Sequence, residues 1–140
     1  MSAGDFFLDT NILVYAFHSD STAKQKIAGE LVNKAAQGKG CISFQVVQEF
    51  INLALKKFRP TPPIDEIKLV MKDILLPICK VTSNAGFYHD ALDVHHFTRL
   101  SWYDSLILQA AVETGCKTLY SEDLQDGFKY HGVTVVNPFR

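Results

Sequence analysis

The sequence has little cysteine, no long apolar run and no excess of charge of either sign, and each lack excludes a class of protein. The three cysteines, Cys41, Cys79 and Cys116, are odd in number and include no CxxC pair, so we expect neither a disulfide framework nor a zinc ribbon. No segment is apolar over the length that spans a bilayer, and the first residues lack the pattern of a signal peptide. We therefore expect a cytoplasmic protein without membrane contact.

The near balance of 14 basic and 15 acidic side chains argues against binding of nucleic acid through overall charge. Any nucleic acid would have to be held at a local site. The one tight basic cluster, Lys56, Lys57 and Arg59, is better interpreted as the solvated end of a helix. With 140 residues and 47% hydrophobic side chains, the chain has the size and composition of a single globular domain, 1–140.

Short apolar runs alternate along the chain with stripes of helical spacing. The runs predict strands at 6–8, 41–42, 78–81, 118–120 and 133–136. The stripes, with their caps, predict helices over 12–17, from 20–22 to 38, 43–58, 67–75, from 83 or 84 to 98, and 102–113. Strands separated by helices favour a parallel sheet covered on both faces. The prediction is an α/β sandwich of three layers, with a central, mainly parallel sheet of about four or five strands flanked by helices.

Acidic residues follow two of the predicted strands. Ligands of open parallel sheets collect beyond the carboxyl ends of the strands, where Asp9 follows the first strand while Glu122 and Asp123 follow the fourth. After Asp9 come Thr10 and Asn11, whose short polar side chains can support a carboxylate or a bound water. For Asp9 taken alone, capping of the next helix explains the residue at least as well.

Two further acids lie on strongly apolar helices. Glu49 is at the border of an apolar stripe, between Val46 and Leu53, so we expect it to be partly buried and to need a partner. A salt bridge to Lys56 or to a neighbouring helix would also satisfy it. Asp104 lies in the first turn of its helix, where the macrodipole favours an acid, but it can also project inward from the end of a packed helix.

As a set, Asp9, Glu49, Asp104 and Asp123 suggest a site for Mg²⁺ or Mn²⁺. These hard cations bind carboxylate and water oxygens, and in phosphodiester hydrolysis they activate water and neutralise charge. Without metal, crowded carboxylates repel one another, so at least one of them should have a raised pKa.

The segments FFLDTN, QEFINLAL, WYDSLILQAA and LYSEDLQDG resemble, in order and spacing, the landmarks of the PIN-domain family. The resemblance covers essentially the whole chain and is closest to the VapC-type ribonuclease toxins of bacterial VapBC toxin–antitoxin pairs. It implies a PIN-like fold with Asp9, Glu49 and Asp104 as the invariant-type acids and Asp123 as the fourth, more variable one.

The same resemblance implies that Asn11 and Ser121 are supporting polar residues. The sequence offers three candidates for the fourth acid, because Glu122, Asp123 and Asp126 lie close together. Asp123 is our choice. Asp126 is the reserve, as a residue that orients a water, although a turn before Gly127 explains it better.

The mechanism that the family implies is hydrolysis of RNA by a metal-bound water, without a covalent enzyme intermediate. Such toxins commonly form homodimers, and a VapB-type antitoxin silences them with a tail that lies beside the third and fourth helices and reaches the acids. A housekeeping RNA-processing nuclease of the same family is the alternative.

Other readings of the sequence remain. An aspartyl-phosphate phosphatase would need a second acid where Asn11 stands, and a noncatalytic module could use the acids to dock a basic peptide. The spacing of His89, Asp93 and His96 on one helix face could suit zinc, but a solvated face explains it better.

Overall fold

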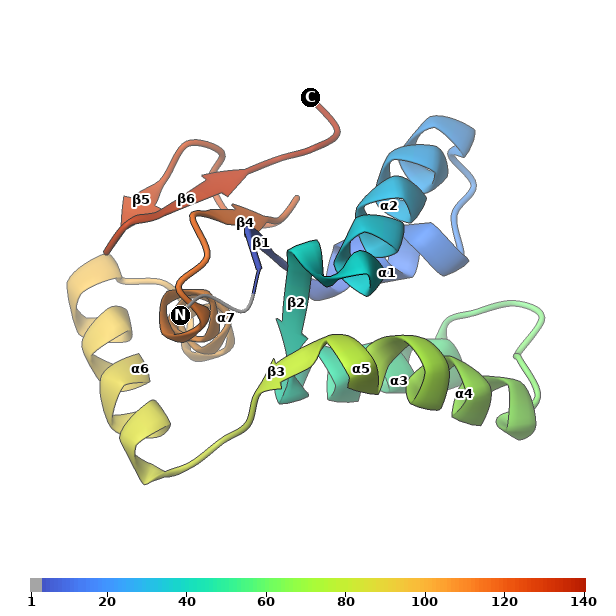
Figure 1. Cartoon of the computed structure of the whole chain (residues 1–140), viewed down its shortest axis with the longest axis horizontal. Coiled ribbons are helices and arrows are strands. Elements are labelled where there is room, and N and C mark those ends of the chain that lie inside the picture. The colour runs from blue at the N-terminus through green and yellow to red at the C-terminus, as the bar shows by residue number, and fades with distance from the viewer. Residues whose placement is uncertain (1–3) are drawn as a thin grey trace.

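The computed structural model describes residues 4–140 and has a six-stranded sheet between helices (Figure 1). Its strands are β1 (Phe6–Leu8), β2 (Gly40–Ser43), β3 (Cys79–Val81), β4 (Thr118–Tyr120), β5 (Lys129–Tyr130) and β6 (Val133–Val136). The strand order is β3-β2-β1-β4-β6-β5, and every neighbouring pair is parallel except β5 with β6. The α/β class and the mainly parallel sheet expected from the sequence are confirmed.

Helices cover both faces of this sheet. They are α1 (Thr10–Phe17), α2 (Thr22–Lys34), α3 (Phe44–Lys56), α4 (Ile64–Val70), α5 (Leu76–Ile78), α6 (Ala85–Thr98) and α7 (Trp102–Thr114), with π-helical turns η1 (Ala35–Lys39) and η2 (Met71–Leu75). In Figure 1, α6 and α7 lie on one side of the strands and α1 and α2 on the other. Helix α7 contacts β1, β2, β3 and β4, because its residues are buried without interruption from Ser105 to Ala111.

The central strand β1 is buried along its whole length, as expected of a parallel strand covered on both faces. It pairs with β2 on one side and with β4 on the other. In the β1–β2 pair Phe6 lies opposite Gly40, and a Cβ at position 40 would overlap the Phe6 ring. Glycine is therefore needed at this point of the core.

The carboxyl ends of β1 and β4 form the point at which the strand order reverses. The chain adds β2 and β3 on one side of β1, then crosses back to place β4 on the other side. The backbone N–H of Asp9 donates to the carbonyl of Tyr120 at 3.0 Å, which brings the residues after the two strands together. Crevices for ligands form at such switch points.

Three local predictions from the sequence need correction. The sheet has six strands rather than four or five, because a short antiparallel strand, β5, turns into β6 through His131 and Gly132, both with positive φ. Ser43, the cap expected at the start of the helix over 43–58, makes no capping hydrogen bond. The helix expected over 67–75 continues past Pro77 and ends at Ile78.

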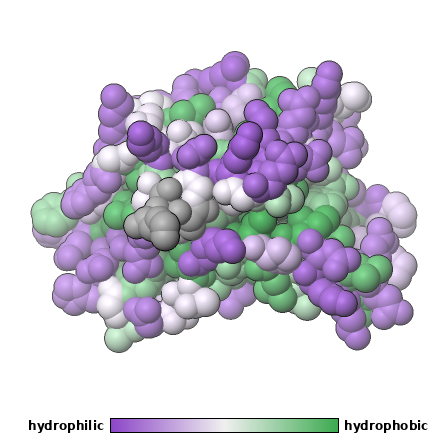
Figure 2. Space-filling view, in the orientation of Figure 1, coloured by the Kyte–Doolittle hydropathy of each residue, from purple (hydrophilic) through white to green (hydrophobic). Residues whose placement is uncertain are grey.

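The surface shown in Figure 2 is hydrophilic over most of its rim, with hydrophobic side chains gathered nearer the middle. Among the helices of residues 4–140, we find none with the length and apolar character needed to cross a bilayer. The three cysteines form no disulfide.

Candidate active site

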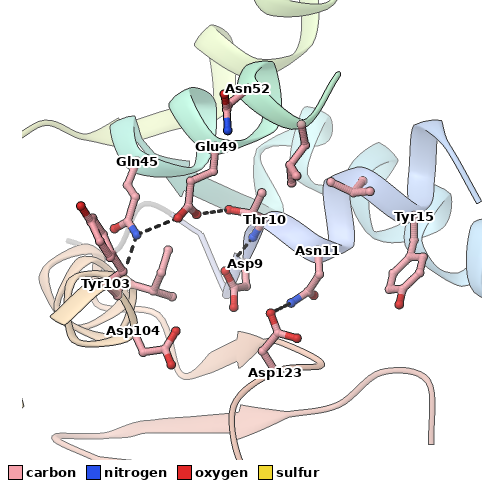
Figure 3. A pocket seen from close by; sticks show the side chains of 13 residues that line it. Asp9, Thr10, Asn11, Tyr15, Gln45, Glu49, Asn52, Tyr103, Asp104 and Asp123 are labelled. Carbon is pink, nitrogen blue, oxygen red and sulfur yellow. Dashed lines mark hydrogen bonds between the residues drawn. The ribbon is translucent and has the colours of Figure 1, made fainter. Parts of the chain in front are cut away.

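A cavity of about 430 Å³ lies at the carboxyl ends of β1 and β4, between α1, α3 and α7 (Figure 3). Among the residues described, its lining contains four acids and no lysine, arginine or histidine. The polar and acidic lining residues include Asp9, Thr10, Asn11, Gln45, Glu49, Asn52, Tyr103, Asp104 and Asp123. The structure therefore brings together all four acids that the sequence singled out.

Asp9 is the most deeply buried of these acids, with 6% of its surface exposed. Its carboxylate accepts hydrogen bonds from the backbone N–H of Thr10 and from the Ser121 hydroxyl, both at 2.7 Å. Burial nevertheless raises the pKa of Asp9 from 3.8 to about 7; the two hydrogen bonds lower it, and the charges of Asp123 and Glu49 raise it further. We expected crowding to raise one pKa in this set, and burial is the larger cause.

Glu49 is half-buried on α3, as its place at the border of the apolar stripe predicted. The Thr10 hydroxyl donates to one of its carboxylate oxygens at 2.6 Å. The Gln45 amide donates to the other at 3.3 Å. Within residues 4–140, Glu49 forms no salt bridge with Lys56 or any other basic residue, so its negative charge is not neutralised by the protein.

Gln45 was not identified from the sequence. It is buried one turn before Glu49, and its amide nitrogen also donates to the backbone carbonyl of Tyr103 at 3.2 Å. The same side chain thus joins α3 to α7 next to Asp104, as Figure 3 shows. Its amide oxygen is buried without a hydrogen-bond partner. The i, i+4 spacing to Glu49 is the only sequence signal that could have pointed to it.

Asp104 lies in the first turn of α7 with Ser101 as the N-cap, whose hydroxyl accepts from the Asp104 backbone N–H at 3.2 Å. The residue is half-buried. Burial raises its pKa; the Ser101 hydroxyl lowers it, and the charges of Asp123 and Glu49 raise it further. Both sequence explanations hold: Asp104 occupies a favourable helix start, and its side chain lines the cavity.

The loop after β4 brings Asp123 to the cavity. The Asn11 amide donates to the Asp123 carboxylate at 3.0 Å, and the Asp123 backbone N–H donates to the Ser121 hydroxyl at 3.2 Å. Ser121 is fully buried and therefore links Asp9 to the loop that carries Asp123. Asn11 and Ser121 thus contact the acids that they were expected to support.

The two other candidates for the fourth acid are engaged elsewhere. Glu122 pairs with the Lys24 ammonium at 2.5 Å and accepts from the Tyr15 hydroxyl at 2.5 Å. Asp126 accepts a hydrogen bond from the backbone N–H of Asn137 at 2.8 Å and does not line the cavity. Of the three acids that the sequence left open, only Asp123 is in the cavity.

The donor set of this cavity suits a hard divalent cation. Carboxylate and amide oxygens surround a space without a basic side chain, and one of the acids is buried at a cost that a cation would relieve. In the described part of the chain, the only three His, Cys, Asp or Glu side chains with ligand atoms within 4.8 Å of one another belong to His89, Asp90 and Asp93. No three of the four cavity acids come that close to one another.

On α6, the side chains that lie close enough together to bind a metal ion are not the three that the sequence spacing suggested for zinc. His89 and Asp93 group with Asp90, and His96 is not part of the group. All three grouped side chains are exposed, as expected of a solvated helix face.

Comparison with known proteins identifies a family and a solved structure of similar fold. A family model described as the PIN domain matches residues 6–130. Among solved structures, FitAcB from Neisseria gonorrhoeae aligns with a TM-score of 0.64 over 96% of this chain and 98% of that chain, at 15% sequence identity. At that identity the likeness concerns the fold alone. No curated protein matches the chain.

Proposed function

The chain belongs to the PIN-domain family, whose members are generally nucleases, and on this basis we propose that it is a metal-dependent endoribonuclease. The observation that carries the proposal is the cavity itself. Acids from four separate places in the chain, after β1, on α3, on α7 and after β4, line one space that contains no basic side chain among the described residues. Such a space attracts cations and needs one to bring a phosphodiester close to it.

Asp9, Glu49, Asp104 and Asp123 would hold Mg²⁺ or Mn²⁺, with waters completing the coordination. When bound, the metal would supply an activated water and neutralise the charge that develops on the phosphate.

The surrounding side chains would position these acids. Thr10 and Gln45 fix the Glu49 carboxylate from two sides, at 2.6 Å and 3.3 Å. Asn11 holds Asp123 at 3.0 Å. Outer hydrogen bonds of this kind orient ligands and commonly affect metal affinity or activity by about 10-fold to 100-fold.

Tyr103 is the best candidate for contact with an RNA base. Its side chain is 65% exposed, yet the residue lines the cavity beside Asp104. Phe87 and Trp102 are less suitable, because Phe87 is buried and Trp102 stacks on Tyr88. A base stacked on Tyr103 would place its phosphate near the acids.

We propose further that the protein is the toxin of a type II toxin–antitoxin pair and acts on RNA in the cytoplasm. An apolar cavity of about 80 Å³ between α1, α3 and α4, lined in part by Phe17, Phe50, Phe58 and Ile67, would accept an apolar side chain of a VapB-type antitoxin tail. Exposed apolar side chains, such as Leu69 and Leu92, would be available to a homodimer interface.

The test is cleavage of a mixed RNA substrate by the purified chain with Mg²⁺ or Mn²⁺ and with EDTA. Cleavage should require metal and should be abolished in Glu49→Gln, while Glu30→Gln, which changes an exposed acid on α2, should cleave normally. Metal-independent cleavage, or equal activity of the two variants, would refute the proposal. Growth arrest on expression, relieved by Glu49→Gln, would distinguish a toxin from a housekeeping nuclease.

A further inference from the structure

Two of the three cysteines lie side by side in the core although they are 75 residues apart in the chain. Cys41 belongs to β2, opposite Phe7 of β1, and Cys116 lies between the end of α7 and the start of β4. Their sulfur atoms are 3.7 Å apart, and both residues are buried. Neither lines the cavity of the active site, so they are a nucleophilic pair that the proposed function does not use.

The surroundings of the two sulfur atoms make them chemically different. The hydrogen bond with Cys41 lowers the pKa of Cys116 from 9.0 to about 7, against the effect of burial. The Thr114 hydroxyl, 2.9 Å from the Cys116 sulfur, also lowers this pKa. The hydrogen bond between the two cysteines, followed by burial, raises the pKa of Cys41, whose thiol can also donate to the carbonyl of Phe6 at 3.8 Å. Cys116 is therefore the thiolate of the pair, and Cys41 remains its protonated partner.

Cys116 is also the better placed of the two for attack on a dissolved oxidant. It has 3% of its surface exposed, whereas Cys41 has none, and its neighbours Gly115 and Lys117 line a cavity of about 330 Å³. The thiolate is the form of cysteine that reacts with peroxides. Hydrogen peroxide is little larger than water, so a slightly exposed thiolate is within its reach.

From these contacts we propose that Cys41 and Cys116 form a redox-sensitive pair, which hydrogen peroxide converts into an intramolecular disulfide. The Cys116 thiolate attacks a peroxide oxygen, the O–O bond breaks, and the sulfur becomes a sulfenic acid. The Cys41 sulfur then attacks this sulfenic sulfur; the S–S bond forms, the S–O bond breaks, and the released hydroxide takes the Cys41 proton. In sum, the two thiols lose two electrons and two protons, and the peroxide becomes two waters.

The bond requires the two sulfur atoms to approach from 3.7 Å to about 2 Å. Cys116 lies outside α7 and β4, so rotation of its side chain with a small shift of this connecting segment can supply the movement. The disulfide would join β2 to the segment leading into β4, across the central strand β1. In a reducing compartment it would form during exposure to peroxide and be reversed by cellular thiols. This inference does not rest on the proposed nuclease function.

The experiment counts free thiols in the full chain before and after treatment with hydrogen peroxide. After removal of the peroxide with catalase, the chain is unfolded, alkylated with iodoacetamide and analysed by mass spectrometry. The untreated chain should take up three alkyl groups and the oxidised chain one, at Cys79. Cys41 and Cys116 should be recovered as one cross-linked peptide that dithiothreitol separates. Three alkyl groups after treatment, or oxidation of Cys116 to a sulfinic acid beside a free Cys41, would overturn the proposal.

Variants test the order of the steps. Cys79 is less buried, but its sulfur contacts the Val81 carbonyl rather than another cysteine, so the matched control Cys79→Ala should form the same disulfide. Cys41→Ser keeps a donor to Cys116 but cannot form the bond, so dimedone should trap the sulfenic acid of Cys116. In Cys116→Ser the protonated Cys41 should take up at least about tenfold less dimedone.

No disulfide in Cys79→Ala, or equal dimedone labelling of the other two variants, would overturn the proposal. The count of thiols in the parent chain needs no substitution, so it decides even if a variant does not fold.

Discussion

Replacing Asp9 by asparagine should remove most of the pH dependence that this site gives to the stability of the metal-free protein. The folded-state pKa of Asp9 is raised from 3.8 to about 7, mainly by burial. Between these two values the folded protein holds a proton that the unfolded chain releases, so the contribution of Asp9 to stability is largest at low pH. It decreases as pH rises and is gone above pH 7.

The size of the effect follows from the same shift. From pH 5 to pH 7 the folded protein retains the proton and the unfolded chain does not, and at about 1.4 kcal/mol per pH unit the parent loses about 3 kcal/mol. For a domain of this size that corresponds to a fall of roughly 6 to 12 °C in melting temperature. Asp104 also has a raised pKa, but it is present in both proteins, so the difference between them reports Asp9.

The assay is urea denaturation of the parent and of Asp9→Asn at pH 5 and pH 8 in EDTA. The quantity to compare is the change in the free energy of unfolding between the two pH values. The stabilities at a single pH differ for another reason, because asparagine cannot accept both of the hydrogen bonds that Thr10 and Ser121 donate to Asp9. The parent should lose about 3 kcal/mol more than the variant between the two pH values. If both proteins lose the same amount, Asp9 is not a buried carboxyl that is protonated at pH 5, and the reasoning fails.

Three further predictions concern the acids and their supports. Asp104→Asn should lose RNA cleavage yet melt at or above the temperature of the metal-free parent, because it removes a half-buried charge that repels Glu49 and Asp123; a marked fall in melting temperature would contradict this. Gln45→Leu should weaken Mn²⁺ binding, measured by calorimetry, by about tenfold, because Gln45 fixes the Glu49 carboxylate, and an unchanged dissociation constant would reject that role. Leu119→Ala, in the fully buried β4 position, should cost about 2 to 5 kcal/mol in chemical denaturation, and a loss below about 1 kcal/mol would mean a poorly packed core.

The sequence predicted the features that depend on hydrophobic periodicity. Strand β1 is a continuous apolar run because both its faces are buried, and α7 is rich in apolar residues and ends at Gly115, whose positive φ stops the helix. Strand β5 could not be predicted, because Lys129 and Tyr130 form only a two-residue pairing in a polar segment. That pairing depends on β6 and on the turn, and local pattern does not reveal either.

Local sequence pattern was also unable to tell which of the acids after β4 reaches the cavity. Glu122 and Asp123 are adjacent, so no spacing rule separates them; Lys24 and Tyr15, about a hundred residues away, hold Glu122 away from the cavity. Gln45 was missed for a similar reason, since its role depends on the approach of α7, whose Tyr103 carbonyl it meets. Contacts between distant elements decide which of several equivalent polar residues reaches a site.

A connected set of hydrogen bonds explains why the acids remain together although they repel one another. Thr10 contacts Asp9 through its backbone N–H and Glu49 through its hydroxyl. Ser121 donates to Asp9 and accepts from the backbone of the loop that carries Asp123. Each contact uses a residue at the carboxyl end of β1 or β4, so the pairing of these two strands helps to hold Asp9, Glu49 and Asp123 close together without a cation. The fold therefore bears the cost of holding these acids in one cavity, and the raised pKa of Asp9, caused mainly by burial and further by the charges of Asp123 and Glu49, is the measurable sign of that cost.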